Sequence, residues 1–140
     1  MSAATGHCLC GAVRYEVHGP LRDLVVCHCE ECRRWHGTVC VASAARREDL
    51  VLTSSEELRW IVSPQSESGA RRGFCGACGS SLFWDAPGRP TISIAAGTLD
   101  QPTGLRVIAH GHTAMPADWD VLPDDGLPRH PGRSGTPPPG

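Results

Sequence analysis

Short runs in which hydrophobic and β-branched residues alternate with polar ones recur along the whole chain, with turn residues between them. They cover residues 12–17, 24–26, 38–44, 50–52, 58–62, 81–84, 91–96 and 105–109. Such runs, bounded by Gly, Pro, Asp and Ser, are typical of β-strands. Because no convincing amphipathic helix lies between them, the pattern predicts an all-β domain of short antiparallel strands with little helix, rather than βαβ units.

One of these runs allows a second interpretation. The segment SSEELRW, residues 54–60, could begin a helix at a serine cap with Glu57 at the third helical position. The β-branched residues Ile61 and Val62 follow it, and such residues favour extended backbone. We therefore expect a strand at 58–62.

The chain organisation predicts one domain and a tail. A chain of 140 residues can bury one hydrophobic core, and no linker divides residues 1–130. The last ten residues, PGRSGTPPPG at 131–140, have nothing apolar to bury. We expect them to form a flexible tail.

Composition and charge limit the classes of partner. A net charge of -2 without a basic block argues against nucleic acid as a partner. No apolar stretch approaches the roughly 20 residues of a membrane span, and the first residues do not resemble a signal peptide. These observations predict a cytoplasmic protein without a membrane partner, and they leave the oligomeric state open. Few aromatic residues, 16 glycines and 12 prolines predict a modest core that needs further cross-links.

Eight cysteines can provide those cross-links. They fall into CLC (Cys8, Cys10), CHCEEC (Cys27, Cys29, Cys32), a lone Cys40 and CGAC (Cys75, Cys78). Thiols in the cytosol are kept reduced, so the clusters are better explained as metal ligands than as disulfides. Residues i and i+2 of an extended strand face one side, so each C-x-C could offer both sulfurs to one ion. Zinc, which binds thiolates and prefers four tetrahedral ligands, is the expected cofactor.

The seven clustered cysteines divide as four plus three, but the spacing allows more than one division. If CLC pairs with CGAC, one site is closed and the central three keep an open position, as in catalytic rather than structural zinc sites. Alternatively, CLC could join two of the central three. All seven could also be structural, with His28, His36 or Cys40 closing the second site. Cys40 lies in TVCVASA, where we expect a buried and inert thiol.

Four segments resemble one known family. GHCLCGAVRYEV at 6–17, CHCEECRRWHG at 27–37, RRGFCGACGSSLFW at 71–84 and AAGTLD at 95–100 are similar to the motifs of the glutathione-dependent formaldehyde-activating enzymes, which include the centromere-protein V relatives. The likeness extends over about residues 6–129. After AAGTLD it is loose, and HGHTAMPAD at 110–118 does not follow the family residue by residue.

This resemblance implies a fold, a cofactor set and an activity. The fold would be a β-tent stapled by two zinc ions. Cys8, Cys10, Cys75 and Cys78 would form the structural site, and Cys27, Cys29 and Cys32 the catalytic one. The activity would be that of a carbon–sulfur lyase, combining glutathione or a similar thiol with formaldehyde or another small aldehyde to give an adduct such as S-(hydroxymethyl)glutathione.

Several other residues are candidates for the same site. His28 or His36 could help by moving a proton. His36, four residues after Cys32, is better placed to reach the open position, whereas His28 lies between two ligands and should point away from the metal. Guanidinium groups bind carboxylates through paired hydrogen bonds, so arginines beside the clusters could hold the substrate. These arginines are Arg33, Arg34, Arg71 and Arg72. Trp35 and Trp84 flank the clusters as walls or as substrate contacts.

Two other functions fit the same cysteines. A non-catalytic binding module would have the second zinc site closed by His36 or Cys40. A thiol redox sensor would release zinc and form a disulfide on mild oxidation.

Overall fold

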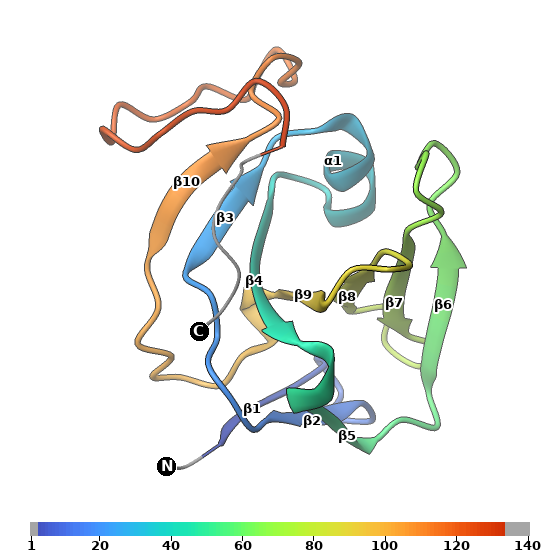
Figure 1. The fold of residues 1–140 in the computed structure, drawn as a ribbon. Coiled ribbons are helices and arrows are strands. Elements are labelled where there is room, and N and C mark those ends of the chain that lie inside the picture. The colour runs from blue at the N-terminus through green and yellow to red at the C-terminus, as the bar shows by residue number, and fades with distance from the viewer. Residues whose placement is uncertain (1–2, 134–140) are drawn as a thin grey trace.

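In the computed structural model, residues 3–133 form two β-sheets and one α-helix (Figure 1). The strands are β1 (Ala4–His7), β2 (Arg14–Val17), β3 (Leu24–Cys27), β4 (Cys40–Arg46), β5 (Leu50–Ser54), β6 (Leu58–Val62), β7 (Arg71–Cys75), β8 (Ser81–Asp85), β9 (Thr91–Ala95) and β10 (Val107–Gly111). The helix is α1 (Glu30–His36), and two short 3-10 turns are η1 (Arg47–Asp49) and η2 (Ala96–Thr98). The predicted all-β class with little helix is confirmed.

The hydrophobic pattern located most of the strands. All eight predicted runs overlap a strand, and the run at 58–62 is β6 rather than a helix. Two strands were not predicted. β1 is only four residues long, and β7 reads RRGFC, so its two arginines and Gly73 hide the hydrophobic alternation. Both unpredicted strands run directly up to cysteine clusters.

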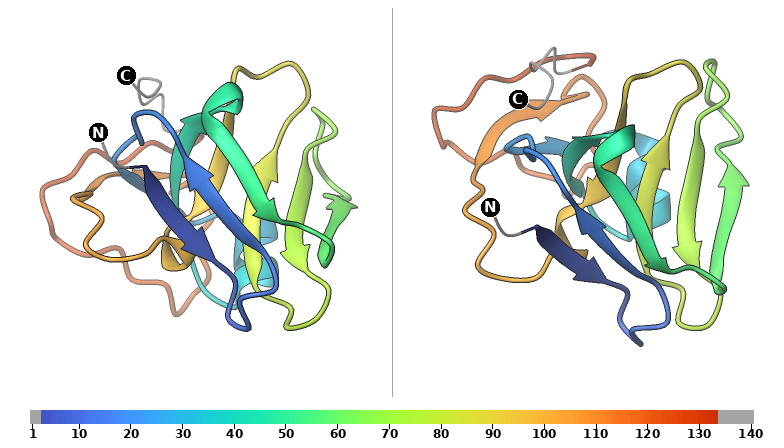
Figure 2. Two further views of the ribbon diagram at one scale, coloured as in Figure 1. Left: turned by 90° about the horizontal axis from the view of Figure 1, so that it is seen from below. Right: turned by 60° about the horizontal axis from the view of Figure 1, so that its bottom comes forward.

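The strands form two sheets that enclose the core. One has the order β1-β2-β5, and the other has the order β10-β3-β4-β9-β8-β7-β6. The pairs within each are antiparallel except β3 with β10, which is parallel. The small sheet lies at the opposite end of the molecule from α1 (Figures 1 and 2). Tyr15 of β2 packs edge-on against Phe83 of β8, with ring centroids 5.3 Å apart, so aromatic contact joins the two sheets.

Helix α1 lies between the β3–β4 side and the β7–β6 side of the large sheet (Figure 1). Trp35 fixes it there, because its Nε1 donates to Ser81 Oγ of β8 at 2.7 Å and its ring packs against Phe74 of β7. The helix and the ends of β3 and β4 therefore form one border of the region that holds the central cysteines.

After β10, residues 112–133 form a long irregular loop at the end of β10 and β3 that is nearer to α1 (Figure 1). A parallel bridge joins His110 to Arg129, and His130 N donates to His110 O at 2.9 Å. Most of the predicted tail, residues 134–140, lies outside the described residues. Within residues 3–133, no helix is long and apolar enough to cross a membrane.

Candidate active site

Four cysteines from two connections far apart along the chain, β1–β2 and β7–β8, meet in one cluster. The sulfurs of Cys8, Cys10, Cys75 and Cys78 all lie within 4.8 Å of one another. Cys8 and Cys10 follow β1 in a turn, and Cys75 and Cys78 connect β7 to β8. The expectation that a C-x-C presents both sulfurs from an extended strand is therefore wrong here, since the backbone turns between them. Gly79, with a φ of 81°, adopts the left-handed conformation that lets its N–H reach Cys75 O at 2.8 Å.

Backbone amides and Ser80 donate hydrogen bonds to sulfurs of this cluster. Cys8 Sγ accepts from Val13 N at 3.3 Å, and Cys75 Sγ accepts from Cys78 N at 3.5 Å. Hydrogen bonds from the side chain and backbone of Ser80 lower the pKa of Cys78 to about 5. Metal binding requires deprotonated thiols, and amides that donate to sulfur stabilise that form. These residues could hold a metal ion with four sulfur ligands.

Three cysteines form a second cluster at the start of α1. The sulfurs of Cys27, Cys29 and Cys32 lie within 4.8 Å of one another. Cys27 ends β3, and Cys29 caps α1 by accepting from Cys32 N at 3.3 Å. The helix ends at Gly37, which has a φ of 81° and donates to Arg33 O. The N-cap at Cys29 and the C-cap at Gly37 define this short helix, and the start of the helix sets the spacing of the three sulfurs.

Arg72 connects this cluster to β7. Its Nη1 and Nη2 each lie 3.8 Å from Cys32 Sγ, and its Nε donates to Ser63 Oγ at 3.1 Å. Hydrogen bonds from Cys27, Cys29 and Cys40, and then the charge of Arg72, lower the pKa of Cys32. Ser63 in turn donates to the carboxylate of Glu31 on α1. A buried cation therefore stands directly against the sulfur cluster.

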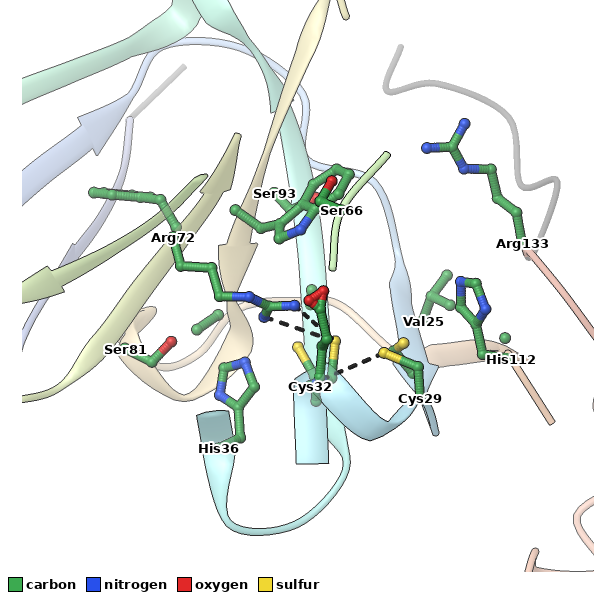
Figure 3. A pocket seen from close by; sticks show the side chains of 18 of the residues that line it. Val25, Cys29, Cys32, His36, Ser66, Arg72, Ser81, Ser93, His112 and Arg133 are labelled. Carbon is green, nitrogen blue, oxygen red and sulfur yellow. Dashed lines mark hydrogen bonds between the residues drawn. The ribbon is translucent and has the colours of Figure 1, made fainter. Parts of the chain in front are cut away.

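The three central cysteines open onto a cavity of about 400 Å³. Its lining combines β3, α1, β4, β7, β8 and β9 with residues 111–115. Figure 3 shows Arg72 reaching toward Cys32, His36 on the same side, and His112 and Arg133 beyond Cys29. The four-cysteine cluster does not line this cavity, so the two clusters have different surroundings.

Some predicted candidates line the cavity and others do not. Arg72, His36 and Trp84 line it, and burial lowers the pKa of His36. Arg33 and Trp35 are not among its lining residues. The Nε of Arg33 is buried without a hydrogen-bond partner among residues 3–133.

Two further candidate arginines are held by carboxylates. Arg34 pairs with Glu30 along the helix, with Nε 3.0 Å from Oε1. Arg71 pairs with Asp85, with Nη2 3.0 Å from Oδ2, and lies over the ring of Trp60. Neither lines the cavity. The sequence did not single out Arg22, Arg89 or Arg133, which do line it. They come from segments outside the strands, where no motif or periodicity identifies them.

His28 points away from the sulfurs and belongs to a buried polar chain. Its Nδ1 lies 2.6 Å from Asp120 Oδ2, and its Nε2 lies 2.9 Å from His110 Nδ1. His110 Nε2 lies 2.7 Å from Asp125 Oδ2. The three contacts bind residues 120 and 125 to β3 and β10. No motif in the sequence identified His110, because its contacts with His28 and Asp125 join segments that are far apart along the chain.

Cys40, for which the sequence predicted a buried and inert thiol, is partly buried and lies beside the three-cysteine cluster. It is opposite Cys27 in the β3–β4 pair and lines the cavity. A hydrogen bond with Cys32, followed by burial, raises the pKa of Cys40. It is a neighbour of the three-cysteine cluster, although its sulfur does not belong to the group of three.

Comparison with known proteins agrees with this geometry. The model of the family "Glutathione-dependent formaldehyde-activating enzyme" matches residues 3–114. The chain belongs to this family. All seven clustered cysteines, Arg72 and His36 lie inside the matched region, whereas Asp120, Asp125 and Arg133 lie outside it.

One protein of known sequence and one solved structure are also similar to this chain. A Schizosaccharomyces pombe protein named as an uncharacterized lyase is 30% identical over 79 residues, which are 56% of this chain and 55% of that protein. The matched region thus spans about half the length of this curated relative. The crystal structure of a Rhodobacter sphaeroides protein is 26% identical, covers 89% of this chain and 98% of its own, and has a TM-score of 0.58. This likeness supports the same fold.

Proposed function

We propose that this protein is a zinc-dependent carbon–sulfur lyase that combines glutathione or a similar thiol with formaldehyde or another small aldehyde. Membership of the family and the similarity to a protein named as a lyase support a lyase. The observation that carries the proposal is the contrast between the clusters. Four cysteines complete a set of four ligands away from the cavity, and three cysteines stand at its wall.

The chemistry of the donor set fits zinc. Cys8, Cys10, Cys75 and Cys78 would hold a structural ion, and Cys27, Cys29 and Cys32 would hold the second ion. Thiolates are among the preferred ligands of zinc, and a catalytic site keeps one position for water or substrate. When bound at the second site, zinc would lower the pKa of an incoming thiol and polarise an aldehyde oxygen.

The reaction exchanges one bond at sulfur for another and moves one proton. The sulfur–hydrogen bond of the thiol breaks, and its sulfur bonds to the carbonyl carbon. The π electron pair of the carbonyl moves to oxygen, and the proton released by sulfur ends on that oxygen. The reverse reaction cleaves the carbon–sulfur bond.

His36 and Arg72 are the residues that we assign to this chemistry. Burial keeps the pKa of His36 below its usual 6.5, so near neutral pH its ring is unprotonated and can accept the thiol proton. Arg72 offsets the negative charge of three thiolates, because its guanidinium contacts Cys32. His36 would then return the proton to the new hydroxyl group.

The proposal is tested by the rate of exchange between glutathione and its formaldehyde adduct, measured by NMR with ¹³C-formaldehyde. The wild-type protein with zinc should accelerate exchange above the uncatalysed rate, and Cys29→Ser should abolish the acceleration. His36→Gln should reduce it by about 10²-fold. The matched control is His18→Gln, since His18 is exposed, pairs with Glu16 and lies outside the cavity. Acceleration that survives in Cys29→Ser would contradict the proposal.

A second candidate function rests on Cys40. Its thiol contacts Cys32 and faces the same cavity, so it could complete a closed set of four sulfurs in a non-catalytic module. Cys40→Ser separates the two functions. The lyase predicts that this variant keeps two zinc ions and its exchange activity, whereas a closed site predicts weaker retention of the second ion.

A further inference from the structure

The cavity has a cluster of positive charge apart from the sulfurs. Arg22, Arg89 and Arg133 all line it. Within residues 3–133 no carboxylate is recorded within 4.0 Å of any of these three guanidinium groups, whereas Arg34, Arg47, Arg59, Arg71 and Arg106 each have one. Three arginines of the cavity lining, which interact through their charges in the order Arg22, Arg89 and Arg133, therefore have no acidic partner among the described residues.

The protein holds this cluster in place through neutral groups. Arg22 Nε donates to Asp23 O at 3.0 Å, and its Nη2 donates to Ala42 O at 2.9 Å. The guanidinium carbon of Arg89 lies 5.3 Å from the ring centroid of Trp84. These contacts orient both cations without neutralising them. Burial, and then the charge of Arg89, lowers the pKa of Arg22, and burial, then Arg133 and Arg47, lowers that of Arg89.

The acidic residues of the cavity lie on α1 and have partners of their own. Glu30 pairs with Arg34, and Glu31 accepts from Ser63. Bringing like charges together in a partly buried place raises the electrostatic free energy unless an anion binds between them. A ligand with a carboxylate would relieve this cost, and guanidinium groups bind carboxylates through paired hydrogen bonds.

The strand register fixes how far this cluster lies from the sulfurs. Arg22 binds the carbonyl of Ala42, which is opposite Val25, and Cys40 is opposite Cys27. Two residues along a strand correspond to roughly 7 Å. A ligand that reaches both places needs several bonds between its sulfur and its carboxylate. Simple uncharged thiols lack the anion, and free cysteine is too short.

We propose that Arg22, Arg89 and Arg133 form a carboxylate subsite that selects a peptide-like thiol substrate. This inference deepens the proposed function and rests on it for the identity of the site. It transfers the role of carboxylate binding from Arg33 and Arg34, which the sequence suggested, to residues that face the cavity.

The test measures binding of S-methylglutathione and of its diethyl ester to the zinc-loaded protein by calorimetry. The methyl group blocks the sulfur, so binding is measured without turnover and without coordination by a thiolate. Wild type should bind the acid about tenfold or more tightly than the ester, because the ester cannot accept charge-assisted hydrogen bonds from the guanidinium groups. Arg89→Gln should weaken binding of the acid about tenfold and leave binding of the ester unchanged.

Two further variants complete the experiment. Arg22→Gln should reproduce the effect of Arg89→Gln, and if Arg22→Gln does not fold, Arg89→Gln alone decides. Arg106→Gln is the matched control, since Arg106 is exposed and outside the cavity, and it should bind both forms like wild type.

The outcomes distinguish the subsite from the reaction. Equal affinity for acid and ester in wild type, no binding of either, or equal loss of both in Arg89→Gln would overturn the subsite. If the acid preference depends on Arg89 but glutathione–formaldehyde exchange is not accelerated, the subsite stands and the proposed lyase reaction fails.

Discussion

At the scale of single residues, Arg71 and Arg72 show how strand alternation separates two charges. Neighbouring residues of a strand face opposite sides, so one arginine of β7 is exposed and the next is buried. Arg71 pairs with Asp85 and covers Trp60, whereas Arg72 contacts Cys32 and Ser63. Arg71 therefore stabilises the exposed face of the sheet, and Arg72 forms part of the cavity wall.

Asp85 gives a prediction at this scale. It is buried and accepts hydrogen bonds from Arg47 and Arg71, which outweigh burial and lower its pKa below 3.8. The folded state therefore binds fewer protons than the unfolded state. The ionised Asp85 adds its full contribution to the free energy of unfolding above pH 3.8, the pKa in the unfolded state. This contribution is lost as the pH falls through the lower pKa of the folded state.

Asp85→Asn should lower the free energy of unfolding by about 2 kcal/mol at pH 7, measured by urea denaturation. The difference from wild type should shrink as the pH falls below 3.8. Asp124→Asn is the control, since Asp124 is exposed and should show little difference at any pH. A difference that stays constant down to pH 3 would contradict the role of the charge.

At the scale of elements, the segment after β10 depends on a few polar contacts. Residues 112–133 contain no strand or helix longer than a single bridge, and Trp119 and Val121 are exposed. The carboxylates of Asp120 and Asp125 bind the buried rings of His28 and His110. Because His112 and Met115 line the cavity, these contacts also position part of its wall.

Asp120→Asn should therefore loosen this segment while the sheets stay intact. We expect amide hydrogen exchange to accelerate about tenfold across residues 112–130, since a charged hydrogen bond of this kind contributes about 1.5–3 kcal/mol. Asp118→Asn is the matched control, because Asp118 is exposed two residues away. Unchanged exchange in Asp120→Asn would show that the segment is held by other contacts.

The sequence located elements with regular hydrophobic alternation and missed those set by local caps. Helix α1 went unpredicted because it has seven residues and is capped by Cys29, which is not among the usual capping residues. Its acidic first turn, basic last turn and Gly37 were the available signals. The cysteine groups were identifiable by their spacing and by the family resemblance. Arg22, Arg89 and His110 were not, because only the tertiary structure brings these residues to the site from separate segments.

At the scale of the whole molecule, the four-cysteine cluster joins the start of the chain to its later half. Cys8 and Cys10 lie between β1 and β2 of the small sheet, and Cys75 and Cys78 lie at the end of β7 and in the turn to β8 of the large one. Structural zinc can supply about 10–16 kcal/mol, which equals or exceeds the net stability of a typical domain. The second cluster lies between β3 and α1, close together in sequence, and closes no comparable loop.

Cys75→Ser and Cys29→Ser should accordingly have different effects. Cys75 is fully buried, and its replacement should unfold or aggregate the protein. Cys29→Ser should keep the fold and lose activity. Circular dichroism and the yield of soluble protein distinguish the two outcomes. Equal loss of folded protein in both variants would remove the division into a structural and a catalytic cluster.

The most direct test of the central claim is zinc stoichiometry with zinc-edge X-ray absorption, on wild type and Cys29→Ser, before and after addition of glutathione. We predict two zinc ions in wild type and one in Cys29→Ser. In wild type, glutathione should add a sulfur ligand to one of the two ions, and in the variant it should change nothing. Two ions with four protein sulfurs each, and no response to glutathione, would contradict an exchangeable position at Cys27, Cys29 and Cys32.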